Sequence, residues 1–181
     1  MPSEDPATHW KSVYTDRPTE ELTWYQRRPT VSLDLLETIR EEIGDDLLRL
    51  IDVGAGASTL EDHLVARPGW NITALDVTPT GLQRIRDRLD ADETERIDWL
   101  VADITEPLDE LERFDVWHDR AVFHFLTDES DRETYRANLR RAVRPAGRAV
   151  VSTFSPRGPQ TCTIHNTLAH PPDVETRVVE D

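Results

Sequence analysis

The stretch Leu50-Ile-Asp-Val-Gly54-Ala-Gly56-Ala-Ser-Thr59 decides the fold of this chain. The apolar run Leu48–Val53 is too short for a helix and stops at two glycines, which is typical of a buried strand followed by a tight turn. Ser58-Thr-Leu-Glu61 then matches a capping box, in which a hydroxyl and a carboxylate satisfy free amides at a helix start. The order strand, glycine turn, helix predicts one repeat of an α/β sheet.

Further short apolar runs repeat this order along the chain. Asn71–Leu75 ends at Asp76, and Thr78-Pro79 opens a helix, because threonine caps a helix and proline suits its first position. Three more runs follow at Trp99–Ala102, Phe114–Trp117 and Ala149–Phe154. Parallel strands need long crossovers, so this alternation predicts an α/β fold: a Rossmann-like doubly wound sheet of five parallel strands with helices on both faces.

The flanks of this region have weaker patterns. Residues 1–30 hold prolines and aromatic residues without periodicity, and predict an irregular N-terminal arm. A helix capped at Ser32 and stopped at Gly44 then opens the Rossmann-like domain, which we place at residues 31–156. Residues 157–181 predict an irregular tail with one short strand-like stretch at 176–179.

Acidic residues stand at the ends of three successive predicted strands: Asp52, Asp76 and Asp103. Each alone reads as an ordinary turn residue, but open α/β sheets bind ligands at these strand ends. Asp76 is placed to accept hydrogen bonds from a ribose diol, and Asp103 to accept one from an adenine amino group. Asp52, before Gly54 and Gly56, would repel a pyrophosphate and attract an ammonium. The residues predict a ligand in which adenosine is joined to a cation.

These segments resemble the class I S-adenosylmethionine-dependent methyltransferases. LIDVGAGAST, LDVT and VADI are similar to the first three motifs of that family. FDVWHDRAVFHFLTD, residues 114–128, is similar to the fourth-strand motif of the small methyltransferases related to citrate synthase lysine methyltransferase. HWKSVY and LTWYQ are similar to the N-terminal arm of that subgroup. The resemblance covers about residues 9 to 162.

The resemblance implies S-adenosyl-L-methionine as cofactor and a small molecule or a protein as methyl acceptor. It implies catalytic roles for His118, Asp119 and Arg120, with His118, His124 and Asp119 as candidate general bases. His124 lies in an apolar stretch and reads equally as a core histidine. The cofactor contacts implied are Trp24, Tyr25, Asp52, Gly54, Gly56, Asp76, Val77, Asp103, Ile104 and His118.

The family usually continues after the fifth strand with a helix and an antiparallel strand pair. The sequence after Phe154 does not resemble that module, so we expect the C-terminal strand pair to be missing or degenerate. An exposed sheet edge would follow, and with it association into a homo-oligomer. A truncated, nonenzymatic cofactor-binding module is therefore the alternative function, and a nicotinamide- or nucleotide-binding protein is a third.

Charge and composition exclude other classes of partner. The 181 residues include 36 acidic and 21 basic ones, giving a net charge of −15, so nucleic acid is not an expected partner. No basic leader followed by an apolar stretch opens the chain, no segment is long and apolar enough for a membrane, and Cys162 has no second cysteine to pair with. We expect a cytoplasmic protein without a metal site.

The acidic surface predicts a dependence on salt. Lys11 is the sole lysine, and an acidic, lysine-poor chain is typical of halophilic proteins, although an acidic bias of a GC-rich coding sequence is the alternative. Because salt screens like charges, the melting temperature should rise between about 0.1 and about 2 M KCl. Thermal unfolding followed by circular dichroism checks this, with sucrose as a control for general exclusion effects. A flat or falling curve would contradict salt adaptation.

Overall fold

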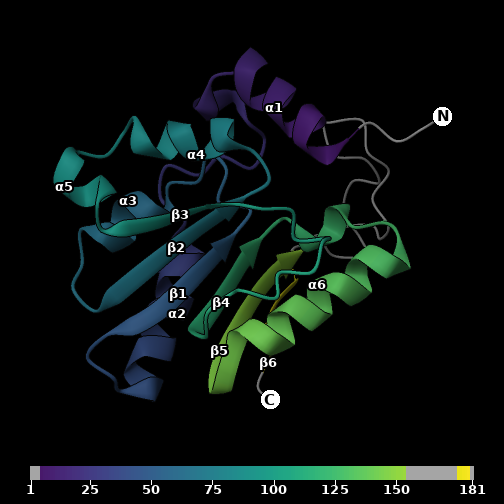
Figure 1. The fold of residues 1–181 in the computed structure, drawn as a ribbon. Coiled ribbons are helices and arrows are strands. Elements are labelled where there is room, and N and C mark those ends of the chain that lie inside the picture. Colours follow the sequence, from purple (N-terminus) through teal and green to yellow (C-terminus); the bar gives the residue numbers. More distant parts are fainter. Residues whose placement is uncertain (1–4, 154–174, 180–181) are drawn as a thin grey trace. The chain divides into compact units, whose positions relative to one another are not determined.

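The computed structural model describes residues 5–153 and the strand at 175–179, so Cys162 lies outside the described residues. The chain forms two compact units, one up to Asp103 and one from Ile104. Figure 1 shows the elements of both. The first unit contains α1 (Pro6–Asp16), η1 (Thr19–Glu21), α2 (Thr30–Ile43), β1 (Leu48–Val53), α3 (Leu60–Val65), β2 (Trp70–Asp76), α4 (Pro79–Arg86), α5 (Ala91–Thr94) and β3 (Ile97–Val101).

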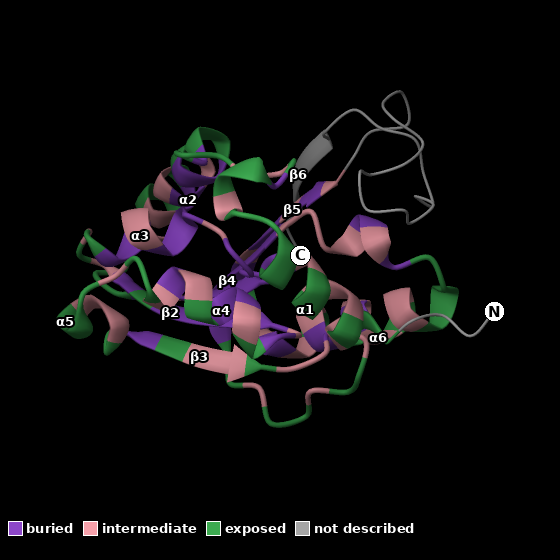
Figure 2. Cartoon of the chain, turned by 90° about the horizontal axis from the view of Figure 1, so that it is seen from above, coloured by how far each residue is buried: buried purple, intermediate pink, exposed green. Residues whose placement is uncertain are grey.

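The strands of the first unit are parallel, in the order β3-β2-β1. Their register pairs Val53 with Leu75 and Asp76 with Val101, so the three strands end side by side. Every residue of β1 except Arg49 is buried, as is every residue of β2 except Asn71. Since alternate residues face opposite sides, both faces of these strands are covered. In Figure 2 the buried colour follows β2, whereas β3 carries exposed positions.

The second unit contains β4 (Phe114–Arg120), η2 (Phe123–Phe125), α6 (Glu129–Ala142), β5 (Val143–Thr153) and β6 (Glu175–Val179). β4 and β5 are parallel, and β4 is buried along its length except at Arg120. With β1, β2 and β3 these make the five parallel strands that the sequence predicts, and the fold is Rossmann-like. No helix in the described part of the chain is long and apolar enough to cross a bilayer.

The C-terminal part of the chain adds one strand to the sheet. β6 pairs antiparallel with β5, from Ala149 opposite Val179 to Thr153 opposite Glu175. The outer side of β5 is therefore paired, and β6 coincides with the short strand-like stretch that the sequence predicts at 176–179. Its short β-branched run was visible in the sequence, but only the pairing partner makes such a stretch a strand. β6 is the last strand in the order of the sheet, and association into a homo-oligomer stays a prediction.

The N-terminal arm is also more regular than expected. Asp5 caps α1 by accepting a hydrogen bond of 3.0 Å from the Thr8 backbone N–H, and Pro6 takes the first helical position. The pair Asp5-Pro6 is typical of a helix start, but the weak apolar periodicity of residues 1–30 led the sequence analysis to predict an irregular arm. Tyr14 is the one buried residue of α1.

Two predicted helix starts need correction. α2 begins at Thr30, which places Ser32 inside the helix, while Gly44 ends it as expected with a φ of 74°. The Ser58–Glu61 capping box does not form: Ser58 Oγ accepts from the Leu60 N–H, and Glu61 is buried.

A buried polar chain joins β4 to α6. Trp117 Nε1 donates to the Tyr135 hydroxyl at 3.0 Å, and that hydroxyl donates to Asp119 at 2.7 Å. Asp119 also accepts from the backbone N–H groups of Val122 at 2.8 Å and Phe123 at 3.1 Å. Tyr135 thus satisfies two buried groups at once, and its ring packs on Trp117 and Phe123.

Removing the Tyr135 hydroxyl should destabilise the second unit. In Tyr135→Phe both Trp117 Nε1 and the Asp119 carboxylate lose a partner, which should cost about 1 to 3 kcal/mol of unfolding free energy. Urea denaturation measures the loss. Thr38→Ala, which removes an exposed helix hydroxyl, is the matched control and should change stability by less than about 0.5 kcal/mol. Equal midpoints for wild type and Tyr135→Phe would contradict this role.

Candidate functional site

The glycine turn after β1 is fixed by backbone contacts to β2. Gly54 and Gly56 have φ values of 68° and 50°, a left-handed conformation that glycine adopts without strain. The Ala55 N–H donates to the Leu75 carbonyl at 2.9 Å. The Ala102 N–H in turn donates to the Asp76 carbonyl at 3.0 Å, which ties the end of β3 to the end of β2. The sequence placed these strand ends together correctly.

Gly56 also faces a close neighbour that the sequence analysis missed. A side chain at this position would bring its Cβ within 2.1 Å of the Tyr14 hydroxyl and 3.2 Å of Asp76 Oδ2. Gly81 meets the same tyrosine ring, since a Cβ there would lie 2.8 Å from Tyr14 Cε2. Tyr14 therefore lies on a surface made by two glycines. Burial and the nearby Asp76 carboxylate raise the pKa of Tyr14 well above its usual value.

Asp76 is buried at the end of β2 and accepts several hydrogen bonds. Its Oδ1 accepts from Thr78 N at 2.8 Å and Thr78 Oγ1 at 3.1 Å. Burial raises the pKa of Asp76 to about 6, although hydrogen bonds from Thr78 and from the Gly56 backbone oppose the rise. Its charge is held beside the glycine turn, where it can accept a hydrogen bond from a ligand hydroxyl.

Two further acids lie close to this turn. Asp52, the last residue but one of β1, has only 3% of its surface exposed, and Glu61, on the first turn of α3, is 0% exposed. Burial raises the pKa of Glu61 well above its usual value, and the neighbouring Asp52 raises it further. Because the sequence analysis interpreted Glu61 as part of a helix cap, it did not predict that this side chain is buried beside Asp52.

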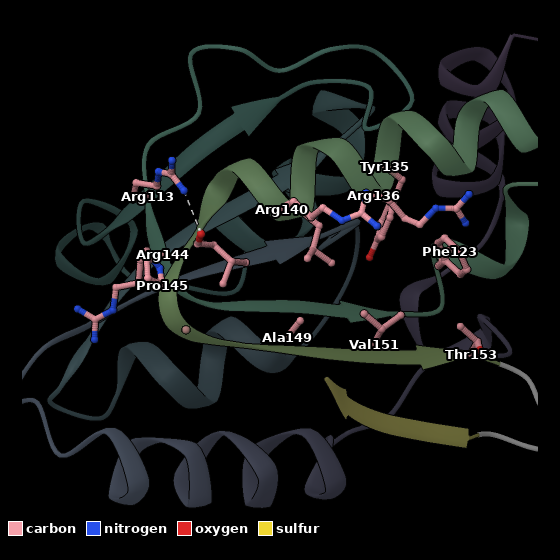
Figure 3. A pocket seen from close by; sticks show the side chains of 13 residues that line it. Arg113, Phe123, Tyr135, Arg136, Arg140, Arg144, Pro145, Ala149, Val151 and Thr153 are labelled. Atoms are coloured by element: carbon pink, nitrogen blue, oxygen red, sulfur yellow. Dashed lines mark hydrogen bonds between the residues drawn. The ribbon is translucent and has the colours of Figure 1, made fainter. Parts of the chain in front are cut away.

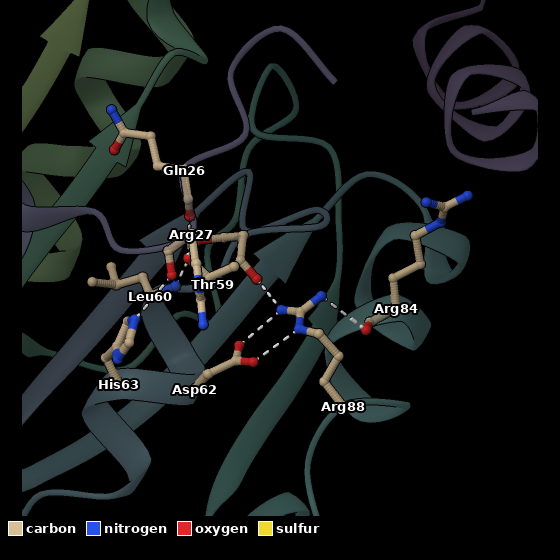
Figure 4. Close-up of polar contacts among 9 residues, drawn as sticks. Gln26, Arg27, Thr59, Leu60, Asp62, His63, Arg84 and Arg88 are labelled. Carbon is tan, nitrogen blue, oxygen red and sulfur yellow. Dashed lines mark hydrogen bonds and ion pairs between the residues drawn. The ribbon is translucent and has the colours of Figure 1, made fainter. Parts of the chain in front are cut away.

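Polar contacts hold the exit of the glycine turn in place (Figure 4). Thr59 Oγ1 donates to the Gln26 carbonyl at 2.7 Å, and His63 Nε2 lies 3.2 Å from the Arg27 carbonyl. Arg88 forms a two-pronged ion pair with Asp62, with both distances 2.8 Å, and also donates to the Ser58 carbonyl. The arm and the segment after α4 therefore both anchor the turn.

The predicted aromatic residues of the arm lie beside this turn. Trp24 and Tyr25 are half-buried against a cluster formed by Tyr14, Leu22 and Ala57, and Ala57 belongs to the glycine turn. Trp10 joins them, with its ring 5.6 Å from that of Trp24 and 6.0 Å from that of Tyr14. Arg84 fixes the end of α1 by donating to the backbone carbonyls of Tyr14 and Arg17.

The other predicted cofactor residues are accounted for as follows. Val77 is half-buried directly after β2, and Asp103 is half-buried just beyond β3. Ile104, 6% exposed, opens the second unit. Their predicted contacts with a cofactor remain predictions.

The predicted catalytic residues stand on β4 in the second unit. β4 runs to Arg120 rather than ending at Trp117, so His118 and Asp119 are strand residues, 1% and 0% exposed, and Arg120 is half-buried. Burial raises the pKa of Asp119 to about 6, although its hydrogen bonds lower it. Ala121 follows with a φ of 79°, a conformation unusual for alanine that the Asp119 hydrogen bonds support. Asp119 holds this turn in place.

The structure favours the prediction that His124 is a core histidine over the prediction that it is a general base. It is 8% exposed, and its ring lies 4.2 Å from that of Phe125. Burial lowers the pKa of His124 to about 4, so the ring is neutral and a weak base at neutral pH.

A groove lies between α6 and β5 in the second unit (Figure 3). Its volume is about 580 Å³, and its apolar lining includes Leu139 from α6 and Ala149 and Val151 from β5. The arginines at positions 113, 136, 140 and 144 also line it. No group of three or more His, Cys, Asp or Glu side chains between residues 5 and 153 is arranged to hold a metal ion.

The glycine turn, the strand-end acids and the strand order define a domain of the class I S-adenosylmethionine-dependent methyltransferase type. Residues 51–149, more than half of the chain, match a family model described as a methyltransferase domain, and the chain belongs to this family. No curated protein matches the sequence.

Solved structures share the fold. A TehB-like SAM-dependent methyltransferase from Corynebacterium glutamicum is 20% identical, with a TM-score of 0.53 over 65% of this chain and 60% of that one. The structure described for conversion of a disulfide bond into a thioacetal group during echinomycin biosynthesis is 26% identical, with a TM-score of 0.62 over 84% and 63%. The DhpI-SAM-HEP complex is 15% identical, with a TM-score of 0.58 over 84% and 69%. The chain thus spans about 60% of the first two.

Asp76 offers the sharpest single test of this site. In Asp76→Ala a ligand's ribose diol loses a charge-assisted acceptor, so the affinity for S-adenosylhomocysteine should fall about 10- to 150-fold. Asp103→Ala should reduce the affinity less, because an adenine amino group is a neutral donor. Isothermal titration calorimetry measures both variants. Equal affinity in wild type and Asp76→Ala would overturn the assignment of Asp76.

Proposed function

We propose that this chain binds S-adenosyl-L-methionine at the ends of β1 and β2 and transfers its methyl group to a small-molecule or protein acceptor. The observation that carries the proposal is the buried Asp76 carboxylate beside Gly56, whose backbone is left-handed. The turn that contains Gly56 comes after the acid Asp52 and has no lysine of the kind that a phosphate-binding loop carries. Family membership over residues 51–149 supports it.

Several residues of the first unit have roles under this proposal. Asp76 accepts from the ribose diol, Asp103 faces the adenine, and the backbone of Gly54 and Gly56 permits close approach. The Tyr14 hydroxyl lies against Gly56, so a ribose placed there has to displace it. Trp24 and Tyr25 then cover the ligand and exclude water, which strengthens the electrostatic contacts inside.

The bound cofactor supplies an electrophilic methyl group on a sulfonium. The chain's own contribution is alignment, since in-line attack needs little covalent help and good orientation can contribute about 7 to 11 kcal/mol of the barrier. On β4, His118 and Arg120 are proposed to contact the acceptor. Where the acceptor is an ammonium, His118 is proposed to take a proton from it, and the resulting amine attacks the methyl group. Asp119 is proposed as a positioning residue, because three donors already occupy its carboxylate.

Two measurements test the proposal. Calorimetric titration with S-adenosylhomocysteine, NAD and ATP should show binding of the first alone, because Asp52 repels a pyrophosphate. Transfer of a radiolabelled methyl group from S-adenosylmethionine to the small-molecule and protein fractions of a cell extract should then show which acceptor class is used. Binding of NAD or ATP in preference would reject the cofactor. Cofactor binding without transfer to either fraction would leave a nonenzymatic binding module.

A further inference from the structure

The groove between α6 and β5 combines a partly exposed apolar surface with basic side chains. Leu139 on α6 and Val143 and Val151 on β5 line it, and all three are only half-buried. Figure 3 shows Arg136 and Arg140 along α6, with Val151 pointing from β5 toward the helix. The volume of about 580 Å³ lies within the range of roughly 300 to 1,000 Å³ that small-molecule sites occupy. The groove is therefore large enough to hold a small organic ligand.

The charge of this groove is opposite to the charge of the chain. Of the 181 residues 36 are acidic, and the net charge is −15. Among the residues that the structure describes, thirteen line the groove, of which four are arginines and none is acidic. An apolar surface beside guanidinium groups, without a carboxylate in its lining, is complementary to a ligand that has a negative charge and an apolar body.

Two of the four arginines are paired with acids of the same chain. Arg136 forms an ion pair with Glu129 on α6. Arg144, near the start of β5, forms one with the buried Asp115 of β4. These ion pairs explain both arginines without a ligand, so the remaining two carry the positive charge of the groove.

Arg113 and Arg140 have no acidic partner in the described part of the chain. Arg113 donates to the Val143 carbonyl at 3.1 Å, which is a neutral acceptor at the end of α6. Arg140 lies in the last turn of α6, is exposed, and has neither a hydrogen bond nor an ion pair with any residue that the structure describes. The helix dipole favours a cation at this place but does not engage its N–H groups, so the Arg140 guanidinium is available to a carboxylate.

The charge of the whole chain decides which kind of anion fits this groove. Salt at about 0.15 M screens exposed charges beyond about 8 Å, so a small anion inside the groove interacts mainly with the guanidinium groups beside it. An acidic protein or an anionic bilayer would bring many negative charges toward a chain of net charge −15 and would be repelled. Charge and volume together therefore favour a free small molecule as the occupant.

We propose that this groove binds a free organic carboxylate with an apolar chain, with the carboxylate beside Arg140 and the chain against Leu139, Ala149 and Val151. A guanidinium can donate two parallel hydrogen bonds to a carboxylate, which gives the head group a defined orientation. The inference goes beyond the proposed function and does not depend on it, because every residue that lines the groove belongs to the second unit and none is assigned to the cofactor or to the methyl acceptor.

The test uses octanoate, its neutral counterpart octanamide, and acetate, which has the charge without the chain. Isothermal titration calorimetry at constant KCl should show that the wild type binds octanoate at least about 10-fold more tightly than either of the others. Arg140→Gln should weaken octanoate about 3- to 10-fold and leave octanamide unchanged. Leu139→Ala should weaken both, because it removes apolar contact and no charge. Arg96→Gln, an equal change of charge at an exposed position of the first unit, should alter neither affinity.

Three results would overturn the inference. The first is a wild type that does not bind octanoate. The second is an equal loss of octanoate affinity in Arg140→Gln and Arg96→Gln, which would reflect the net charge and not the groove. The third is Arg140-dependent sedimentation with phosphatidylglycerol vesicles in the absence of octanoate binding, which would assign the groove to a bilayer. Should Leu139→Ala fail to fold, the comparison of Arg140→Gln with Arg96→Gln decides alone, because both arginines are exposed.

Discussion

Burial of carboxylates at the ends of β1 and β2 is the constraint on which the first unit depends. Asp52 and Asp76 are each 3% exposed and Glu61 is fully buried, so their charges are not solvated by water. Asp76 is stabilised by Thr78 and by the Gly56 backbone, which fixes the glycine turn against the start of α4. Asp52 and Glu61 are buried side by side, and each neighbouring acid adds to the effect of burial in raising the pKa of Glu61.

Steric constraints follow from the same arrangement. The ring of Tyr14 occupies the space left by the missing side chains of Gly56 and Gly81, and its hydroxyl lies toward Asp76. Arg84 holds the end of α1 through backbone carbonyls, while Trp10 and Trp24 cover the tyrosine. The N-terminal arm is therefore part of the site, and a ligand that reaches Asp76 has to compete with an aromatic side chain of the same chain.

The second unit shows a different use of a buried acid. Asp119 is surrounded by donors from Tyr135 and from the backbone of Val122 and Phe123, and this full set supports the left-handed Ala121 after β4. A carboxylate so fully engaged serves to shape a turn. Glu61 in the first unit is buried as completely, but its neighbour is another acid, Asp52, which together with burial raises the pKa of Glu61.

The sequence by itself determined the alternation of strands and helices, the glycine turn at Gly54 and Gly56, the Thr78 cap and the three acids at strand ends. These features follow from local rules: apolar run length, backbone freedom of glycine, and capping by short polar side chains. Tertiary structure alone decided the burial of Glu61, the packing of Tyr14 on Gly56 and Gly81, the extension of β4 to Arg120 and the pairing of β6 with β5. Each of these depends on contacts between residues distant in the chain, because burial and strand pairing are set by the neighbour that is present and not by the residue alone.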